Sequence, residues 1–286
     1  MEKNSIIPGT LYLVATPIGN MSDISERALK VLNEVTFIAA EDTRNTGLLL
    51  SRLGISKPLI SYHEYNKAEK GRYLLARLQS NESCALVTDA GTPAISDPGA
   101  DIVKLCIDNN INVTGIPGPC AAINSIILSG LDTKRFVFEG FLPLQNKERK
   151  ERLEEIKKEY RTAVIYEAPH KLIKTLEDFR SVMEQDRKIV LCREMTKINE
   201  EIIRTTVSGT EQLYKDVSPK GEYVIILEGC KKERIIITDP EEEVEKLISS
   251  GMKKMDAIKQ VAKMMGVPKN EIYLKINKES DEKDKC

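Results

Sequence analysis

Two carboxylates, Asp89 and Asp97, and two hydroxyls, Thr92 and Ser96, share one short stretch of the chain that is rich in Gly and Pro. They follow the apolar run 84–87, which is typical of a buried strand, and the prolines and glycines end that strand. Ligands of open α/β sheets bind at the carboxyl ends of strands. The sequence therefore predicts a small-molecule site in this loop.

Four further polar loops follow apolar runs in the same way. Strands are expected at 11–15, 35–40, 59–62 and 111–114, and the loops after them read T-P-I-G-N, E-D-T-R, H-E-Y-N and P-G-P. Apolar strands that alternate with helices predict a mostly parallel, helix-covered sheet, whose strands all end at one edge. For any one of these loops, ordinary turn chemistry is the better explanation, but five loops at one edge favour a ligand site.

The helices expected between these strands position the loops. The first is expected to begin at a capping box formed by Asp23 and Glu26. The others carry Leu48 to Leu53, Leu74 to Leu78 and residues 100–109.

The composition changes after the strand-like run 136–143. Residues 145–161 form a charged segment, typical of a helix with a solvated face. Strands are then expected at 162–166, 188–192, 202–207 and 222–228, with helices near 170–182 and 210–216. This closer strand spacing predicts a mixed or antiparallel sheet.

The predicted fold class is therefore α/β. Residues 1–143 form a first α/β domain with a mostly parallel sheet, and residues 144–237 form a second with a mixed sheet. A small helical appendage follows at 238–286. Within it, residues 246–278 carry eight Lys and two acidic residues, a net charge of +6. The pattern at 257–268 resembles a small helix–turn–helix. Two interpretations stay open for this tail: a contact with RNA phosphates, or a solvated helix that covers the second domain.

The bulk composition excludes several classes of protein. The net charge is −1, Trp is absent and aromatic residues make up 5%, so a DNA-binding protein coated in basic charge is not expected. His63 and His170 are the only histidines, and the six cysteines form no C-x-x-C pair, so no metal site is expected. With no apolar run of membrane-spanning length and no signal-peptide segment at the N-terminus, a cytoplasmic protein without membrane contacts is expected.

Familiar nucleotide-binding motifs are missing as well. The sequence contains no G-x-x-x-x-G-K-[ST], no G-x-G-x-x-G after the first strand and no G-x-S-x-G. Pro93 stands where an ordinary glycine loop would need its second Gly. Backbone amides and carbonyls with few charged groups would suit S-adenosylmethionine (SAM), whose sulfonium tolerates carbonyls and carboxylates.

Nine stretches spread over residues 10–230 carry a resemblance to a known family. They are 11–20 (L-Y-L-V-A-T-P-I-G-N), 40–44 (A-E-D-T-R), 60–66 (I-S-Y-H-E-Y-N), 89–99 (D-A-G-T-P-A-I-S-D-P-G), 116–122 (I-P-G-P-C-A-A), 138–143 (F-E-G-F-L-P), 166–170 (Y-E-A-P-H), 193–197 (R-E-M-T-K) and 220–224 (K-G-E-Y-V). In these stretches the chain resembles the tetrapyrrole-methylase-like (class III) SAM-dependent methyltransferases. E-D-T-R and S-Y-H-E-Y-N point to the RNA-modifying branch of that family.

The resemblance implies a homodimer in which each subunit binds SAM in a cleft between its two domains. It also implies 2′-O-methylation of the ribose of a cytidine in the decoding region of 16S rRNA, within the small ribosomal subunit. The cofactor contacts that it implies are Pro17, Gly19, Asp89, Ala90, Gly91, Thr92, Ser96, Asp97, Pro117, Gly118, Pro119, Cys120, Ala121, Tyr166, Glu167, Ala168 and Glu222. Cys120 and Ala168 stand where the family often has Ser.

Catalysis of such a transfer needs an aligned hydroxyl and a group that takes its proton. The candidates for the general base are Glu41, Asp42, His63 and Glu64, all in loops expected at the same edge. An imidazole exchanges protons most readily near neutral pH, yet each of the four could equally be structural. Arg44 is better suited to bind a phosphate through two hydrogen bonds.

Two other functions compete with this one. The chain could methylate a tetrapyrrole or another small molecule, which the Lys-rich tail and the E-D-T-R stretch disfavour. It could also be an RNA-binding assembly factor without catalytic activity, which the intact loops disfavour. Methyl transfer to a corrinoid, or failure to bind SAM, would decide for one or the other.

Overall fold

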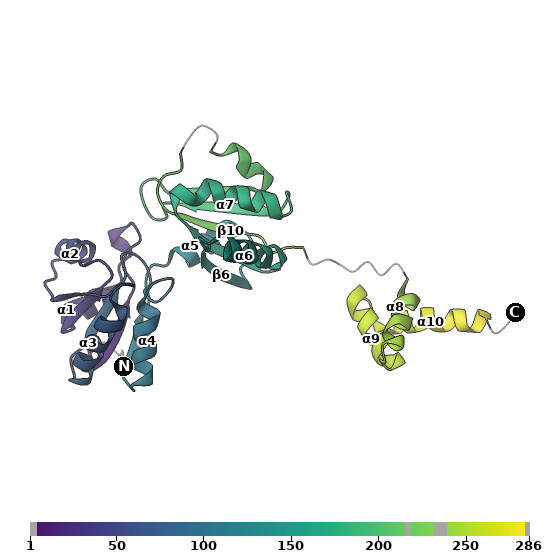
Figure 1. Ribbon diagram of the computed structural model, residues 1–286, viewed down its shortest axis with the longest axis horizontal. Helices are drawn as coiled ribbons and strands as arrows, with labels where there is room; N and C mark the ends of the chain where they lie inside the picture. Colours follow the sequence, from purple (N-terminus) through teal and green to yellow (C-terminus); the bar gives the residue numbers. More distant parts are fainter. Residues whose placement is uncertain (1–4, 215–217, 232–238, 284–286) are drawn as a thin grey trace. The chain divides into compact units, whose positions relative to one another are not determined.

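The structure is a computed structural model that describes residues 5–214, 218–231 and 239–283, with side chains described up to Ile276. The chain forms two compact units, Met1–Cys230 and Lys231–Cys286, which are described separately below (Figure 1). The first unit contains two sheets of five strands each, and the second contains helices.

The first sheet, which the sequence predicted to be mostly parallel, is parallel throughout, in the order β3-β2-β4-β1-β5. Its strands are β1 (Thr10–Val14), β2 (Phe37–Ala40), β3 (Leu59–Ser61), β4 (Cys84–Val87) and β5 (Asn112–Ile116). The helices α1 (Glu26–Glu34) and α2 (Thr43–Arg52) pack on one face, and α3 (Lys67–Gln79) and α4 (Gly99–Asp108) pack on the other. β2 and β4 are buried along their whole length because helices cover both faces.

The first helix does not begin at the predicted capping box. Asp23 lies in a short 3-10 turn, η1 (Met21–Asp23), and the N-cap of α1 is Ser25, whose hydroxyl accepts a hydrogen bond from the Ala28 amide at 3.1 Å. Asp23 lies too far before the helix for its side chain to bond the first-turn amides. The cap is therefore the residue next to the helix and not the acidic residue that the capping-box pattern suggested.

A substitution pair tests this cap. We expect Ser25→Ala to lower the free energy of unfolding by about 1 kcal/mol, because a first-turn amide loses its acceptor. Asp23→Ala should change it by much less. Urea unfolding curves of the two variants measure the difference, and equal losses would contradict the assignment of Ser25.

The second sheet is mixed, as predicted, in the order β6-β7-β10-β8-β9. Its strands are β6 (Phe136–Phe141), β7 (Thr162–Glu167), β8 (Lys188–Arg193), β9 (Glu201–Thr206) and β10 (Tyr223–Leu227). β6 runs parallel to β7 and the other neighbours are antiparallel. The second sheet thus includes a strand that precedes residue 144, where the sequence placed the start of the second domain.

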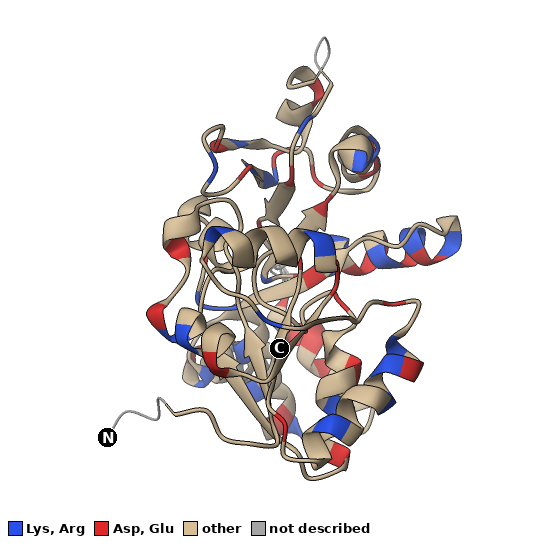
Figure 2. Ribbon diagram, turned by 90° about the vertical axis from the view of Figure 1, so that its left-hand side faces the viewer, with Lys and Arg blue, Asp and Glu red and all other residues tan. Residues whose placement is uncertain are grey.

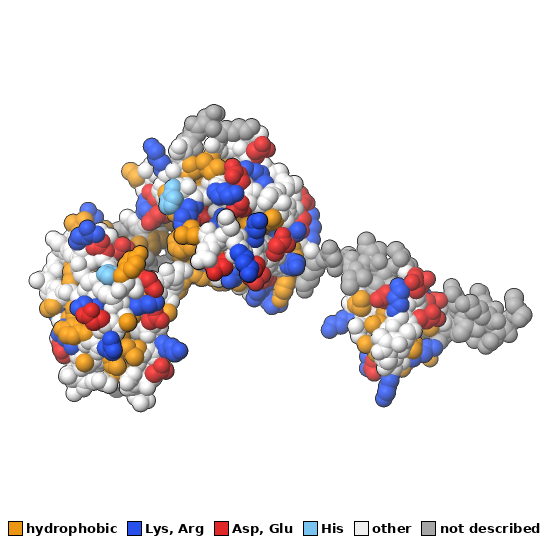
Figure 3. Space-filling view, viewed as in Figure 1, with side chains coloured by type: hydrophobic (Ala, Val, Ile, Leu, Met, Phe, Trp, Pro, Cys, Tyr) orange, Lys and Arg blue, Asp and Glu red, His pale blue; other side chains and the backbone are white. Residues whose placement is uncertain are grey.

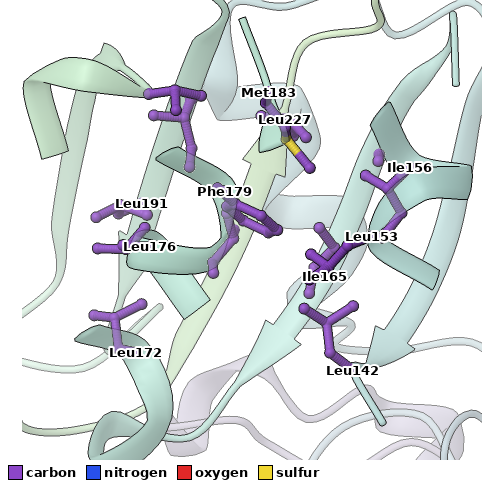
Figure 4. Packing of buried hydrophobic residues seen from close by; sticks show 14 of the residues in the cluster. Leu142, Leu153, Ile156, Ile165, Leu172, Leu176, Phe179, Met183, Leu191 and Leu227 are labelled. Atoms are coloured by element: carbon purple, nitrogen blue, oxygen red, sulfur yellow. The ribbon is translucent and has the colours of Figure 1, made fainter. Parts of the chain in front are cut away.

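Different helices cover the two faces of the second sheet. On one face, α6 (Asn146–Lys158) and α7 (Pro169–Val182) supply Leu153 and Phe179 to an apolar core (Figure 4). On the other face lies α5 (Ala121–Ser129), a helix that the sequence analysis did not predict. α5 follows β5 directly, so it leads the chain from the first sheet onto the second. The helix expected near 210–216 is only a 3-10 turn, η2 (Ser208–Gln212), and residues 215–217 lie outside the described part.

The C-terminal unit contains α8 (Pro240–Ser249), α9 (Lys254–Met265) and α10 (Lys269–Lys283). These helices pack around a small core of Val244, Ala257, Ile258, Val261, Ala262 and Ile272. α9 ends at Gly266 in the left-handed conformation, with φ of 70°, before the short turn into α10. In the described residues of either unit, no helix combines the length and the apolar character that crossing a membrane requires.

Candidate active site

A cavity of about 560 Å³ lies at the carboxyl end of the first sheet, where the first unit's two α/β domains meet. Loops after β1, β2, β4 and β5 line it from the first domain, and β6, β7, β10 and the start of α7 line it from the second. Its volume falls in the range of about 300–1,000 Å³ that small-molecule sites occupy. The lining residues are Ile18, Glu41, Thr88, Asp89, Ala90, Gly91, Thr92, Ile95, Ser96, Asp97, Cys120, Ala121, Phe141, Tyr166, Glu167, Ala168, Pro169, His170, Glu222, Tyr223 and Val224.

The loop after β4 is tied to its neighbours through its backbone. The amide of Gly91 donates to the carbonyl of Thr16 at 3.0 Å, and the amide of Thr16 donates back to the carbonyl of Gly91 at 2.9 Å. Thr92 donates its hydroxyl to the carbonyl of Pro119 at 3.0 Å. Gly91 has φ of 82°, and a Cβ there would lie 3.3 Å from Ile18. Three loops that the sequence placed at one edge are thus joined directly.

Asp97 shapes the same loop. Its carboxylate accepts hydrogen bonds from the amides of Ala94, Ile95 and Gly99 at 3.0, 3.2 and 2.7 Å. These bonds hold the loop although Ala94 and Ser96 both adopt positive φ, at 69° and 65°, a conformation that costs free energy in residues other than Gly. Asp97 therefore stabilises the backbone conformation of the loop.

Asp89 and Glu41 are carboxylates in a different situation. Asp89 accepts a hydrogen bond from the Asn45 side chain at 3.2 Å. Burial raises the pKa of Asp89, and the nearby carboxylates of Glu41 and Asp42 raise it further. Glu41 accepts a hydrogen bond from the hydroxyl of Thr88 at 2.6 Å. The cavity wall from the first domain therefore carries negative potential, which favours a cationic ligand.

The two aspartates of this loop should respond oppositely to substitution. Because the pKa of Asp89 is raised in the folded chain, its ionised form destabilises the fold, and this cost appears as pH rises above the ordinary carboxyl range. We expect Asp89→Asn to raise the melting temperature at pH 7, with a smaller gain at acidic pH. Asp97→Asn should lower the melting temperature, because three amides then share a weaker acceptor. Calorimetric melts at both pH values measure this, and a fall for Asp89→Asn at pH 7 would contradict it.

The second domain supplies an aromatic and polar wall. Tyr166 packs edge-on against Phe138 and Phe141, at centroid distances of 5.0 and 5.7 Å. Its hydroxyl accepts from the amide of Ala122 at 3.3 Å, and burial raises the pKa of Tyr166 to about 12. Since Tyr166 stays protonated at neutral pH, its side chain adds a hydrogen-bonding group to this wall without adding charge.

Two glutamates of this wall are held by neighbouring side chains. The buried Glu167 accepts from Thr175 at 2.5 Å and from the amide of Ala168 at 2.9 Å. Glu222 pairs with Lys197 at 2.8 Å. Both carboxylates are therefore engaged within the protein.

The structure brings together most of the residues proposed for the cofactor. Asp89, Ala90, Gly91, Thr92, Ser96, Asp97, Cys120, Ala121, Tyr166, Glu167, Ala168 and Glu222 all line the cavity. Pro17, Gly19, Pro117, Gly118 and Pro119 are not part of its lining.

Two of these five residues have a visible packing role. A Cβ at Gly19 would meet Lys197 at 2.3 Å, and one at Gly118 would meet the Cβ of Ala15 at 2.9 Å. Gly118, Pro119 and Cys120 line a separate cavity of about 520 Å³. Gly19 and Gly118 thus allow close approach of neighbouring loops.

Of the five catalytic candidates, only Glu41 lines the cavity. Asp42 is the N-cap of α2 and pairs with Arg44 at 2.6 Å, and hydrogen bonds from Arg44 hold the pKa of Asp42 down to about 2. Glu64 pairs with Lys67 at 2.7 Å, and Lys67 also pairs with Asp101.

His63 belongs to its own local network. Its ring Nε2 lies 3.3 Å from the side-chain nitrogen of Asn66, and its backbone amide donates to the Asn66 side chain at 2.8 Å. The buried Nδ1 has no hydrogen-bond partner among the described residues. Asn66 thus holds His63 in the loop before α3.

Several lining residues were not among those predicted from the sequence. They are Ile18, Thr88, Ile95, Phe141, Pro169, His170, Tyr223 and Val224. Most of them lie within or next to the motifs quoted above, and this position in the sequence could have identified them. The apolar ones carry no chemical pattern of their own. The described part of the chain contains no group of three or more His, Cys, Asp or Glu arranged to hold a metal ion.

The chain thus combines a domain with a parallel sheet, a domain with a mixed sheet, and a cavity between the two. Comparison with known protein families shows which class has this arrangement. Residues 10–211 match the model of the tetrapyrrole (corrin/porphyrin) methylases. The chain therefore belongs to the tetrapyrrole methylase family, as the sequence motifs indicated.

Solved structures show the same fold. A uroporphyrin-III C-methyltransferase from Thermus thermophilus has a TM-score of 0.54 at 17% identity and covers 76% of this chain and 94% of its own. A cobalt precorrin-4 methyltransferase of cobalamin biosynthesis has a TM-score of 0.57 at 17% identity, with coverage of 77% and 95%. The part of the chain that they match is about three quarters of its length.

The curated relatives specify the branch of the family. A protein from Synechocystis is 42% identical and covers 96% of this chain and 99% of its own. Proteins from Halalkalibacterium halodurans and Bacillus subtilis are 45% and 43% identical, with 93% of both chains covered. All three are named ribosomal RNA small subunit methyltransferase I.

Proposed function

We propose that this chain transfers a methyl group from SAM to the ribose 2′-oxygen of a cytidine in the decoding region of 16S rRNA. The observation that carries the proposal is the cavity between the two α/β domains, lined by the loops that the family motifs occupy. The full-length similarity to ribosomal RNA methyltransferases supports RNA as the substrate. The protein would then work in the cytoplasm, where small subunits are assembled.

The cavity residues fit SAM. Asp89 and Glu41 give one wall negative potential, which suits a ligand with a sulfonium and an ammonium group. Ile18, Phe141 and Val224 offer apolar and aromatic surface for the adenine ring. Bound SAM would supply an activated methyl group, and the protein's residues would hold it and exclude water.

Glu41 is the residue we propose as general base. A ribose hydroxyl is a weak nucleophile, and general-base assistance contributes about 10²–10⁴ to such reactions. Glu41 lies in the cavity and is oriented by the hydroxyl of Thr88 at 2.6 Å. The other candidates lie outside the lining. Asp42 caps a helix, Glu64 is in an ion pair, and His63 is held by Asn66 in the loop before α3.

Arg44 is the residue we propose for contact with an RNA phosphate. Its side chain is 89% exposed, although its guanidinium is bound to Asp42. Basic and acidic residues are interspersed along the helices (Figure 2), so an RNA substrate would meet individual cations such as Arg44. A phosphate would compete with Asp42 for the same two-pronged contact.

We also propose that the protein acts as a homodimer. The outer face of α5 exposes Ile123, Ile127 and Leu128, at 46%, 62% and 39% of their surface. Neighbouring exposed apolar side chains on one helix are typical of a protein–protein contact. Light scattering measures the mass in solution, and Ile127→Glu should shift a dimer toward monomer.

The choice of substrate separates this function from its rivals. Methyl-labelled SAM is offered together with small subunits from a strain that lacks this protein, or with a corrinoid precursor. The proposal expects label in the small subunits only. Label in the corrinoid alone would favour the small-molecule methyltransferase, and failure to bind SAM in calorimetry would favour the assembly factor.

A further inference from the structure

The C-terminal unit has a groove between α9 and α10, apart from the cavity described above. The groove has a volume of about 150 Å³ and is lined by Met255, Ile258, Lys259, Lys269, Asn270 and Tyr273. Each side contributes a helical i, i+4 pair, Met255 with Lys259 on α9 and Lys269 with Tyr273 on α10. Residues four apart share one face of a helix, so each pair sets an apolar or aromatic group beside a cation.

Charge is unevenly divided within this unit. α8 begins with Asp239 and three glutamates, and its Lys246 is paired with Glu242 at 2.8 Å. Along the groove, the ion pair that Lys259 forms within the described part of the chain is a long one, with Asp256 at 4.0 Å. Among the described residues, none of the ion pairs found involves Lys263 or Lys269. The acidic Glu271 lies in the first turn of α10 but is not part of the groove's lining.

The groove also leaves an aromatic and an apolar side chain partly exposed to solvent. Tyr273 is 44% exposed and Met255 is 49% exposed, over a floor formed by the buried Ile258. Apolar side chains reach the surface of this unit between lysines and acidic residues (Figure 3). An exposed aromatic ring between lysines is the combination with which proteins hold single-stranded nucleic acid, since the ring stacks on a base and the cations bind phosphates.

We propose that this groove binds a segment of single-stranded RNA, with one base stacked on Tyr273 and the flanking phosphates bound by Lys259, Lys263 and Lys269. Lys263 lies one turn beyond Lys259 on α9, outside the groove's lining and toward the turn before α10. Lys269 and Asn270 stand at the N-terminus of α10, where the helix dipole adds to the attraction for a phosphate. Asn270 can hydrogen-bond the edge of the stacked base.

This surface would add a second RNA contact to the one that the proposed function requires at the cavity. It would raise affinity for the substrate without taking part in methyl transfer. Substitutions in the groove should therefore raise the KM for RNA and leave kcat and SAM affinity unchanged.

The test measures binding of a fluorescein-labelled, unstructured RNA 16-mer to the full-length protein by anisotropy, over a range of salt concentrations. Lys259→Gln and Lys269→Gln should each weaken binding and lower the slope of log K against log salt by about 0.7. Lys246→Gln removes the same charge from an ion pair on α8 and should leave both quantities unchanged. Equal effects of all three substitutions would overturn the proposal, because only net charge would then matter.

The aromatic ring has its own matched pair. Tyr273→Phe keeps the stacking surface and should bind like the unmodified chain, whereas Tyr273→Leu should weaken binding about fivefold or more. Thermal melts show that each variant is folded, and SAM titration gives an independent check on the catalytic unit. Equal binding of the Phe and Leu variants would overturn the stacking contact. The same variants are also tested on vesicles that contain phosphatidylserine. If the groove substitutions abolished vesicle binding and left RNA binding intact, the groove would be a lipid-binding surface and the proposal would be overturned.

Discussion

Replacing Glu41 with glutamine is expected to lower kcat for methyl transfer by about 10²–10⁴, while the dissociation constant for SAM stays the same. Glutamine has the shape of glutamate, and its carbonyl oxygen can still accept the hydrogen bond that the Thr88 hydroxyl donates to Glu41 at 2.6 Å. It cannot take a proton from the ribose hydroxyl. The loss should therefore appear in single-turnover rates with labelled SAM and saturating small subunits.

Glu64→Gln is the matched control for this substitution. Glu64 pairs with Lys67 at 2.7 Å outside the cavity lining, and an exposed ion pair contributes little to stability. Its removal should leave the rate unchanged. If Glu64→Gln slowed the transfer and Glu41→Gln did not, the base would have to be sought in the loop before α3.

The second large effect is expected at Gly91. Its φ of 82° lies in the left-handed region, and a Cβ would approach Ile18 to 3.3 Å. A β-branched residue there is strained by about 1–3 kcal/mol, and a shift of the loop that relieves this strain would disturb its bridge to Thr16. We expect Gly91→Val to weaken SAM binding about 10- to 100-fold in isothermal titration calorimetry.

Gly54→Val controls for backbone strain alone. Gly54 has φ of 69° at the end of α2, and a Cβ there meets nothing within 4 Å. Both variants should therefore lose stability, but only Gly91→Val should lose affinity for SAM. Normal SAM affinity in Gly91→Val would show that this loop is not part of the cofactor site.

Much of the first domain could be predicted because its strands are buried on both faces. The runs 37–40 and 84–87 are almost entirely apolar, which is typical of central parallel strands. The polar residues that follow such strands must then lie at one edge. This reasoning led to Glu41 and Asp89, which the structure places in the lining of one cavity.

Other features could not be predicted, for physical reasons. α5 has the sequence A-A-I-N-S-I-I-L-S, which is apolar almost all round, so no helical period marks its buried face. Pairing of β6 with β7 depends on contacts between distant segments, and local propensity does not encode them. The same is true of the pairs between Thr88 and Glu41 and between Asn45 and Asp89.

The cavity's apolar lining was missed for a similar reason. Ile18, Phe141 and Val224 come from three separate segments and are ordinary hydrophobic residues in the sequence. Only the folded arrangement shows that they line a cavity, and two of them, Ile18 and Val224, also belong to a buried apolar cluster. Polar loop residues could be recognised individually, whereas apolar ones could not.

The most direct test of the central claim is to locate the transferred methyl group. Small subunits from a strain lacking this protein are incubated with the purified chain and methyl-labelled SAM, and the 16S rRNA is digested and analysed by mass spectrometry. The account predicts one labelled nucleoside, a cytidine from the decoding region that carries the methyl on its ribose 2′-oxygen. Label on a base, on a different nucleoside, or no label in the RNA would contradict it.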